Sequence, residues 1–212
     1  MNQMLLWIDY AGIVVFAITG CLVAARKHLD IISFILLAIV TGIGGGTLRD
    51  MILNRTVFWV SEPIYLTLCV VTGILMFFFA QRIHRYHQWI VWGDAIGIAV
   101  FSVAGTRIAY DAGASYIVCV FMGVMTSIVG GIIRDILAGE PSLIVRKEIY
   151  ATACVLGSVT FLSLYDVVPE WSVLLGMAAT FILRAAAIVW RMQLPGYRWI
   201  ELHAAQRRST DI

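Results

Sequence analysis

Two copies of one short motif place flexible backbone and opposite charges inside apolar sequence. The first copy is Gly45-Gly46-Thr47-Leu48-Arg49-Asp50, and the second is Gly130-Gly131-Ile132-Ile133-Arg134-Asp135. A charged side chain at the centre of a bilayer costs about 2.5–3.5 kcal/mol on insertion scales, so an intramembrane charge indicates a functional site. Because the chain accepts this cost twice in matching positions, we expect its function to reside at these motifs.

The composition is typical of a polytopic α-helical membrane protein. Of the 212 residues, 61% are apolar and 13% are charged, with a mean hydropathy of +0.90. A soluble domain carries about 25% charged residues. The net charge of +2, without a basic stripe away from the ends of the apolar runs, argues against a nucleic-acid partner.

The chain shows no sequence signature of a catalytic or metal site. Its Ser and His residues have no spacing that suggests a nucleophile with a base, so we do not expect an enzyme. The four cysteines lie singly in different apolar runs without a C-x-x-C pair, which predicts small buried side chains rather than a zinc or redox site. They are Cys21, Cys69, Cys119 and Cys154.

Seven apolar runs are long enough to cross a bilayer, which requires about 20 residues. The predicted spans cover residues 5–25, 30–53, 62–81, 89–109, 114–138, 146–165 and 170–191. The loops and tail on one side hold ten Lys or Arg residues, whereas the other side holds Arg55 alone. Positive residues favour the cytoplasmic side. We therefore predict a multi-pass protein of the inner (plasma) membrane with its N-terminus outside and its C-terminus in the cytoplasm.

The chain contains an internal repeat at a shift of 85 residues. Over residues 9–53 this shift gives 14 identities in 45 positions, including Asp9 with Asp94 and both Arg-Asp pairs. The predicted single domain, 1–212, then consists of repeat one (5–84), repeat two (89–166), a seventh helix (170–191) and a short basic tail (192–212). Since each repeat has three spans, the second must be inverted, as in many transport proteins with a site near the midplane.

The glycines lie deep within spans two and five. Gly45 comes about 15 residues after the start of span two, or roughly 22 Å at 1.5 Å per residue. We expect kinks at Gly44, Gly45 and Gly46 and at Gly130 and Gly131, where unwound backbone would offer carbonyls to cations and N–H groups to anions. The alternative is that the glycines permit close helix packing.

The motif arginines need charged partners or water. Because residues i and i+1 do not face each other on a helix, we expect carboxylates from elsewhere to pair with Arg49 and Arg134. A cross-repeat Arg–Asp contact would close a pore at its waist, and the alternative is interfacial snorkelling. The carboxylates considered are Asp9, Asp94 and the motif residues Asp50 and Asp135 of the opposite repeat.

Four further polar residues occupy matching positions in the repeats. Asp9 and Asp94 lie near the starts of spans one and four, where they either attract cations into a vestibule or cap a helix. Thr41 and Thr126 precede the glycines and can offer hydroxyl ligands or bond back to their own helices. Arg184 in span seven has no counterpart, and the sequence gives it no role.

The chain resembles the prokaryotic trimeric intracellular cation (TRIC) channel family. The resemblance covers about residues 5–191 and rests on the doubled Gly-Gly-x-x-Arg-Asp motif, the three-plus-three-plus-one layout and the stretch Arg146-Lys147-Glu148-Ile149-Tyr150-Ala151. It implies a homotrimer in which each protomer carries an hourglass pore for monovalent cations, K⁺ foremost. It also implies that kinked spans two and five line the constriction near the motif charges. Animal members bind a phosphoinositide, which the basic loops of this chain do not by themselves establish.

Three functions remain open from the residues alone. In a cation channel, the carboxylates would outnumber and neutralise the arginines of the pore, so that K⁺ or Na⁺ permeates. In a carrier for a zwitterion such as glycine, Arg would bind the carboxylate and Asp the ammonium, and similar bacterial sequences have been labelled glycine transporters. The third class is a membrane scaffold or a lipid-modifying enzyme, and the sequence shows no set of catalytic residues to support it. The resemblance favours the channel, with a homotrimer and membrane lipid as the partners and no cofactor.

Overall fold

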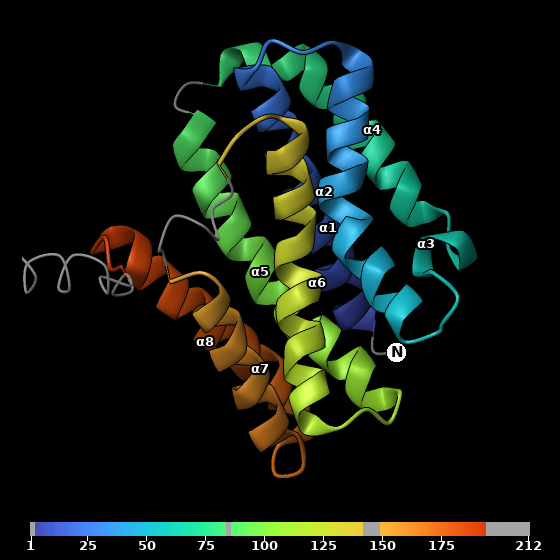
Figure 1. The fold of residues 1–212 in the computed structure, drawn as a ribbon, viewed down its shortest axis with the longest axis vertical. Coiled ribbons are helices and arrows are strands. Elements are labelled where there is room, and N and C mark those ends of the chain that lie inside the picture. The colour runs from blue at the N-terminus through green and yellow to red at the C-terminus, as the bar shows by residue number, and fades with distance from the viewer. Residues whose placement is uncertain (1–2, 84–85, 142–148, 194–212) are drawn as a thin grey trace, which may run out of the picture.

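The computed structural model describes residues 3–83, 86–141 and 149–193 (Figure 1). Its elements run in the order α1 (Gln3–Arg26), α2 (Ile31–Ile52), α3 (Phe58–Ser61), α4 (Ile64–Phe79), η1 (Ala80–Arg82), α5 (Tyr86–Asp111), α6 (Tyr116–Leu137), α7 (Ala151–Tyr165) and α8 (Pro169–Val189). The helices α3 and α4 lie on one side of the central helices, and α7 and α8 lie on the other (Figure 1). The predicted all-α membrane architecture is confirmed.

Two of the seven predicted spans are shorter than expected. The helices α1, α2, α5, α6 and α8 are long and apolar enough to cross a bilayer, whereas α4 has 16 residues and α7 has 15. The predicted span 62–81 begins two residues late, at Ile64, and ends in the 3₁₀ turn η1. The first three residues of the predicted span 146–165 lie outside the described residues, and its helix runs from Ala151 to Tyr165.

The helices α2 and α6 cross each other around a pseudo-two-fold axis. A Cβ added to Gly45 would meet the carbonyl oxygen of Thr126, and one added to Gly130 would meet the carbonyl oxygen of Thr41. Each glycine and each threonine is related to its counterpart by the 85-residue shift. Since the later residue of α2 meets the earlier residue of α6, the two helices are antiparallel and the repeats are inverted.

The helices α1 and α5 also meet through residues that are related by the 85-residue shift. The ring centroids of Phe16 and Phe101, which are also 85 residues apart, lie 5.2 Å from each other. Gly97 faces the ring of Phe16, and Gly12 faces Phe101 and its neighbour Val100. The absence of side chains at these glycines allows the two rings to meet at the centre of the molecule.

The glycine motifs do not unwind their helices. Both α2 and α6 remain α-helical through Gly44, Gly45 and Gly46 and through Gly130 and Gly131. The expectation of freed carbonyls is therefore wrong, and the packing alternative accounts for Gly45 and Gly130, which lie against the backbone of the facing helix. A bend that preserves the helical hydrogen bonds stays a prediction.

The third helices of the two repeats also follow the 85-residue shift, beyond the aligned residues 9–53. Cys69 of α4 and Cys154 of α7 are 85 residues apart, as are their neighbours Gly42 and Ser127. The sulfur of Cys69 lies 2.9 Å from a Cβ built at Gly42, and the hydroxyl of Ser127 donates to the sulfur of Cys154 at 3.2 Å. All four cysteines are free and buried, as predicted.

Buried hydroxyl groups connect α5 to the last two helices. Thr106 of α5 donates to the hydroxyl of Ser158 in α7 at 2.8 Å, and the hydroxyls of Ser102 in α5 and Thr180 in α8 lie 3.2 Å apart. Interhelical hydrogen bonds of this kind contribute on average about 0.6 kcal/mol each in a membrane. They fix α7 and α8 against the second repeat.

Candidate functional site

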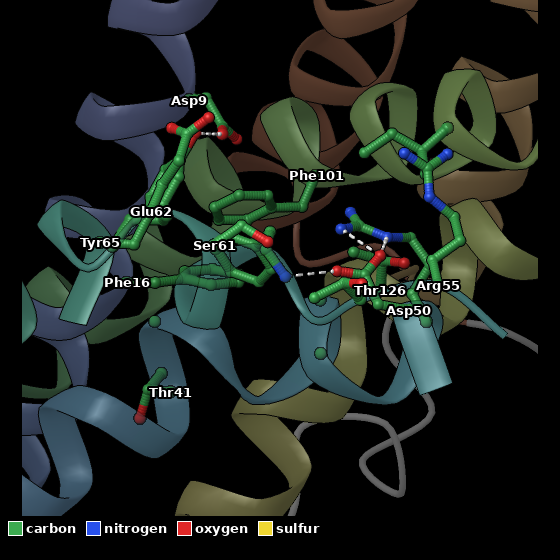
Figure 2. A pocket seen from close by; sticks show the side chains of 18 of the residues that line it. Asp9, Phe16, Thr41, Asp50, Arg55, Ser61, Glu62, Tyr65, Phe101 and Thr126 are labelled. Carbon is green, nitrogen blue, oxygen red and sulfur yellow. Dashed lines mark hydrogen bonds and ion pairs between the residues drawn. The ribbon is translucent and has the colours of Figure 1, made fainter. Parts of the chain in front are cut away.

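A cavity of about 390 Å³, here called the vestibule, lies in the half of the molecule that contains the first motif (Figure 2). It is bounded by α1, α2, α3, the start of α4 and the second half of α5, and it reaches α6 at its inner end, at Thr126. The predicted site residues in its lining are Asp9, Thr41, Gly45, Gly46, Arg49, Asp50 and Thr126. The structure thus brings together residues from both repeats that are far apart in sequence.

Charged groups gather on two sides of the vestibule. The Tyr65 hydroxyl donates to Asp9 Oδ2 at 2.9 Å, with Glu62 beside them. On the other side Arg49 Nε donates to Asp50 Oδ1 at 2.9 Å. Figure 2 shows these two sides, with the aromatic rings between them, through the labelled residues Asp9, Glu62, Tyr65, Asp50, Arg55, Phe16 and Phe101.

The short helix α3 is tied to the end of α2 and covers part of the vestibule. The backbone N–H of Phe58, the first residue of α3, donates to Asp50 Oδ2 at 3.0 Å, and the guanidinium of Arg49 lies 5.7 Å from the Phe58 ring. The indole N–H of Trp59 donates to Thr47 Oγ1 at 2.9 Å. The first Arg-Asp pair therefore positions the vestibule wall as well as lining it.

The inner end of the vestibule lies where the four central helices cross. Thr41 Oγ1 donates to the Leu37 carbonyl and Thr126 Oγ1 to the Met122 carbonyl, each at 2.6 Å. The back-bonding alternative is therefore confirmed for both hydroxyls. Because each hydroxyl proton is committed to its own helix, the oxygen presents lone pairs and can still accept a hydrogen bond or contact a cation.

The second motif forms a closed cluster in the opposite half. Arg134 is 1% exposed, and it grips Asp94 with two contacts, from Nη1 to Oδ1 at 2.8 Å and from Nη2 to Oδ2 at 2.9 Å. Its Nε donates to Asp135 Oδ1 at 2.9 Å. Such a bidentate pair is among the strongest and most directional charge-assisted contacts in proteins. We call Arg134, Asp94, Asp135 and Thr19 the latch cluster.

Three contacts join the repeats across this half. Arg134 Nη1 also donates to Thr19 Oγ1 in α1 at 2.9 Å. Glu140, just after α6, accepts from Arg26 at 3.2 Å and from Lys27 at 2.9 Å at the end of α1. The remaining cavity beside these groups measures about 10 Å³, which is close to the minimum for a single water molecule.

The predicted charge pairing was partly wrong. Adjacent residues do pair in both motifs, because the long Arg side chain folds back onto the neighbouring carboxylate. Asp94 is a partner of Arg134 as predicted, but no ion pair joins Arg49 to Asp9 in the part of the chain that the structure describes. Two cross-repeat ion pairs among the described residues run instead from Arg26 and Lys27 to Glu140.

Two alternative interpretations of these charges, interfacial snorkelling and helix capping, are also excluded. All four motif charges are less than 7% exposed, so they do not snorkel to an interface. Asp9 and Asp94 lie inside α1 and α5 rather than at the first residues of these helices, so they are not caps. The buried charges are held by partners instead.

Comparison with known proteins agrees with this arrangement. A family model described as glycine transporter matches residues 6–81 and 91–166, which correspond to the two repeats. The inner membrane protein YadS of Escherichia coli is 41% identical over 196 residues, which cover 90% of this chain and 95% of YadS. A membrane protein of Vibrio cholerae is 39% identical over 200 residues, covering 92% of this chain and 84% of its own.

The solved structures give the family. The TRIC trimeric intracellular cation channel orthologue from Rhodobacter sphaeroides is 42% identical, with a TM-score of 0.87 over 90% of this chain and 100% of the orthologue. A prokaryotic TRIC channel in 0.5 M KCl is 29% identical, with a TM-score of 0.86 over 92% of this chain and 100% of that one. This chain belongs to the prokaryotic TRIC channel family. It is a multi-pass inner membrane protein and a homologue of cation channels rather than an enzyme.

Several residues of this TRIC homologue's site were missed in the sequence. Tyr65, which binds Asp9, has a counterpart at Tyr150 by the same 85-residue shift, so extending the repeat past residue 53 would have found it. Thr19 was not singled out because its counterpart is Ala104, which breaks the repeat. Glu140 follows α6 and carried no repeat signal of its own.

The structure assigns Arg184 a supporting place in the TRIC fold. It is buried, its Nη1 donates to the Ile149 carbonyl at 3.1 Å, and its guanidinium lies 5.1 Å from the ring centroid of Tyr150. The Tyr150 hydroxyl in turn lies 3.5 Å from a Cβ built at Gly131. Arg184 therefore links α8 to the segment that backs the latch cluster.

Proposed function

We propose that this TRIC homologue is a K⁺-permeable monovalent cation channel in which each protomer of a homotrimer carries one hourglass pore. The constriction lies where α2 and α6 cross, at the glycines Gly44, Gly45, Gly46, Gly130 and Gly131. The observation that carries the proposal is the acidic vestibule, which leads from one face of the molecule to this crossing.

The charge of the vestibule favours cations. Its lining contains four carboxylates against two guanidinium groups, which gives a formal charge of −2. Arg49 is itself neutralised by Asp50, whose Oδ1 lies 2.8 Å from Nη2. A cleft of one sign with low-dielectric walls concentrates counter-ions at its mouth. The carboxylates are Asp9, Asp50, Glu62 and Asp111, and the guanidinium groups are those of Arg49 and Arg55.

The latch cluster closes the other half of the proposed path. A cation that leaves the vestibule meets Arg134, and the side chain is fixed there by Asp94, Asp135 and Thr19. Conduction therefore requires that Arg134 move or release its contact with α1. The described conformation is then the closed state of a pore whose first half is already open.

We place the vestibule outside and the latch cluster on the cytoplasmic side, because the basic residues Arg26 and Lys27 lie at the latch end. A membrane-impermeant maleimide tests this orientation on intact cells with single cysteines at two loop positions. A112C at the vestibule end should react, and H28C should react only after the cells are permeabilised. The opposite pattern would reverse the proposed topology.

Planar-bilayer recording with purified protein in asymmetric KCl tests the channel. Unitary currents that reverse near the K⁺ equilibrium potential are expected. Electrical silence together with saturable counterflow of labelled glycine in liposomes would replace the channel by a carrier. Chemical cross-linking in the membrane tests the trimer, for which a ladder ending at three protomers is expected.

A zwitterion carrier is the second candidate, and one observation favours it. The cavity is open in one half and closed in the other, as in an alternating-access transporter, and it offers both a guanidinium and carboxylates. In that case Arg49 would bind the substrate carboxylate and Asp9 its ammonium. The glycine counterflow measurement separates the two candidates.

A further inference from the structure

A second cavity, of about 340 Å³, lies beside the vestibule and is formed by α1, α5 and α8. We call it the lateral groove. Its inner wall is apolar and includes Val103, Ala104, Val173 and Met177, whereas Asp9, Arg107 and Asp111 stand at its other end. An apolar trough with a few charged groups at one end has the character of a site for an amphiphile.

The charged end of the lateral groove lies where the membrane interface is expected. Arg107 and Asp111 belong to the last turns of α5, which ends at Asp111, and Asp9 belongs to the first turns of α1. Arg107 Nε lies 3.8 Å from Asp111 Oδ2, and the two side chains are 33% and 49% exposed. This contact is longer than a hydrogen bond, so both groups remain open to further partners.

The lateral groove and the vestibule share a wall. Asp9, Ile108 and Asp111 line both cavities. A charged group bound at the end of the groove would therefore lie next to the carboxylates that we propose to attract cations. The groove is thus both a binding site and a point from which the vestibule can be influenced.

We propose that the lateral groove binds one phospholipid whose headgroup carries a phosphate and a primary ammonium. The phosphate lies on the Arg107 guanidinium, the ammonium lies at Asp9 and Asp111, and one acyl chain follows Ala104 and Met177. Charge complementarity selects this lipid class. One guanidinium beside two carboxylates disfavours an anionic headgroup, and a quaternary ammonium cannot donate the hydrogen bonds that carboxylates accept.

Native mass spectrometry of the detergent-solubilised full chain tests the proposal without reference to conduction. The probes are dioleoyl lipids with ethanolamine, glycerol or choline headgroups, added to delipidated protein. We expect the ethanolamine lipid to bind tighter than the other two by about tenfold, the equivalent of about one charge-assisted hydrogen bond. Equal retention of all three lipids would overturn the proposal.

Two sets of variants locate the site. A104F fills the apolar wall, and R107Q with D111N removes the headgroup partners at positions where the side chains are partly exposed, so that the helix packing is kept. Each should lower retention of the ethanolamine lipid about tenfold. The matched controls are L175F and E170Q, which change an exposed apolar side chain and an exposed charge of α8 outside the groove and should leave retention unchanged.

The alternative occupant of the groove is a second copy of the chain. If A104F dissociated the oligomer and left retention of the ethanolamine lipid unchanged, the groove would be a subunit interface and the lipid proposal would be wrong. Where A104F does not fold, the R107Q/D111N variant decides alone. Because the readout is lipid mass, failure of the channel proposal would not affect the result.

Discussion

The two inverted repeats place the same kinds of residue in two different arrangements. In the second repeat, Arg134 grips Asp94 through both carboxylate oxygens, at 2.8 and 2.9 Å, and little space is left. In the first, Arg49 turns to Asp50, Asp9 turns to Tyr65, and a vestibule of about 390 Å³ lies between them. The comparison shows that the same kinds of side chain border a cavity in one repeat and are enclosed in the other, according to the partners that they contact.

Sequence differences at repeat-related positions support this contrast. Thr19 holds Arg134, whereas its counterpart Ala104 has no hydroxyl to offer Arg49. The ion pair Arg26–Glu140 lies beside the latch cluster. By the 85-residue shift, Arg26 corresponds to Asp111 and Glu140 corresponds to Arg55, so the acidic and basic positions are exchanged. Asp111 and Arg55 both line the open vestibule. They are therefore the residues expected to meet if that half closes.

The largest expected effect comes from the buried arginines. R134Q leaves the fully buried Asp94 without its cation, and breaking such a buried pair costs about 3–5 kcal/mol. R49Q is the matched variant and should cost clearly less, because Asp50 keeps the Phe58 N–H and borders the vestibule. Thermal unfolding in detergent measures both. Equal shifts in Tm would show that the two halves do not differ in electrostatic stability.

The glycine pairs give the next effect. G45A would push a Cβ into the carbonyl of Thr126 and should destabilise the protein by about 1–3 kcal/mol. G44A is the control, since its Cβ finds its nearest neighbour at 3.7 Å and gains helix propensity. The same Tm measurement applies, and a harmless G45A would contradict the close crossing of α2 and α6.

The variant T19A replaces Thr19 with the residue type that the second repeat has at the matching position, Ala104. It removes one hydrogen bond to a charged group, which is worth about 1.5 kcal/mol. The latch cluster should then open about tenfold more often. K⁺ flux from loaded liposomes measures this, with T160A on α7, an exposed hydroxyl bonded to its own helix, as the control. An unchanged flux would remove Thr19 from the latch.

The pair between Glu140 and the end of α1 should contribute less. Its side chains are 19–36% exposed, and pairs of this kind are worth about 0.2–1 kcal/mol. E140Q should raise the flux by up to about fivefold, and the effect should shrink in high salt. An effect that persists at 1 M KCl would indicate a role other than charge.

The motif carboxylates, Asp50 in the vestibule and Asp135 in the latch cluster, should give a modest but clear electrical signal. D50N, alone or with D135N, should lower the cation-over-anion selectivity, since a unit charge 4 Å from an ion in water contributes about 1 kcal/mol. The reversal potential in a KCl gradient should move toward zero. D166N, at the end of α7 outside the vestibule lining, is the control. Unchanged selectivity in D50N would exclude Asp50 from the ion path.

The sequence predicted the fold better than the contacts of the site. Hydrophobic runs and a repeat register are written in the order of the residues, so the membrane class and the inverted repeats could be predicted without coordinates. The glycines were expected to unwind, but their effect depends on the backbone of the facing helix, which brings Gly45 to Thr126. The role of Arg184 was invisible for the same reason, since Ile149 and Tyr150 reach it only through packing.

The sequence by itself determined that two equivalent Arg-Asp motifs lie inside the membrane and are related by inversion, because charge in an apolar run and a repeat register are properties of the chain. The tertiary structure decided which motif is closed. Arg134 reaches Asp94 and Thr19, whereas Arg49 and Asp9 bind other partners. Near-identical motifs can differ in this way because an ion pair depends on a few ångströms between helices, and helix packing rather than the motif sets that distance.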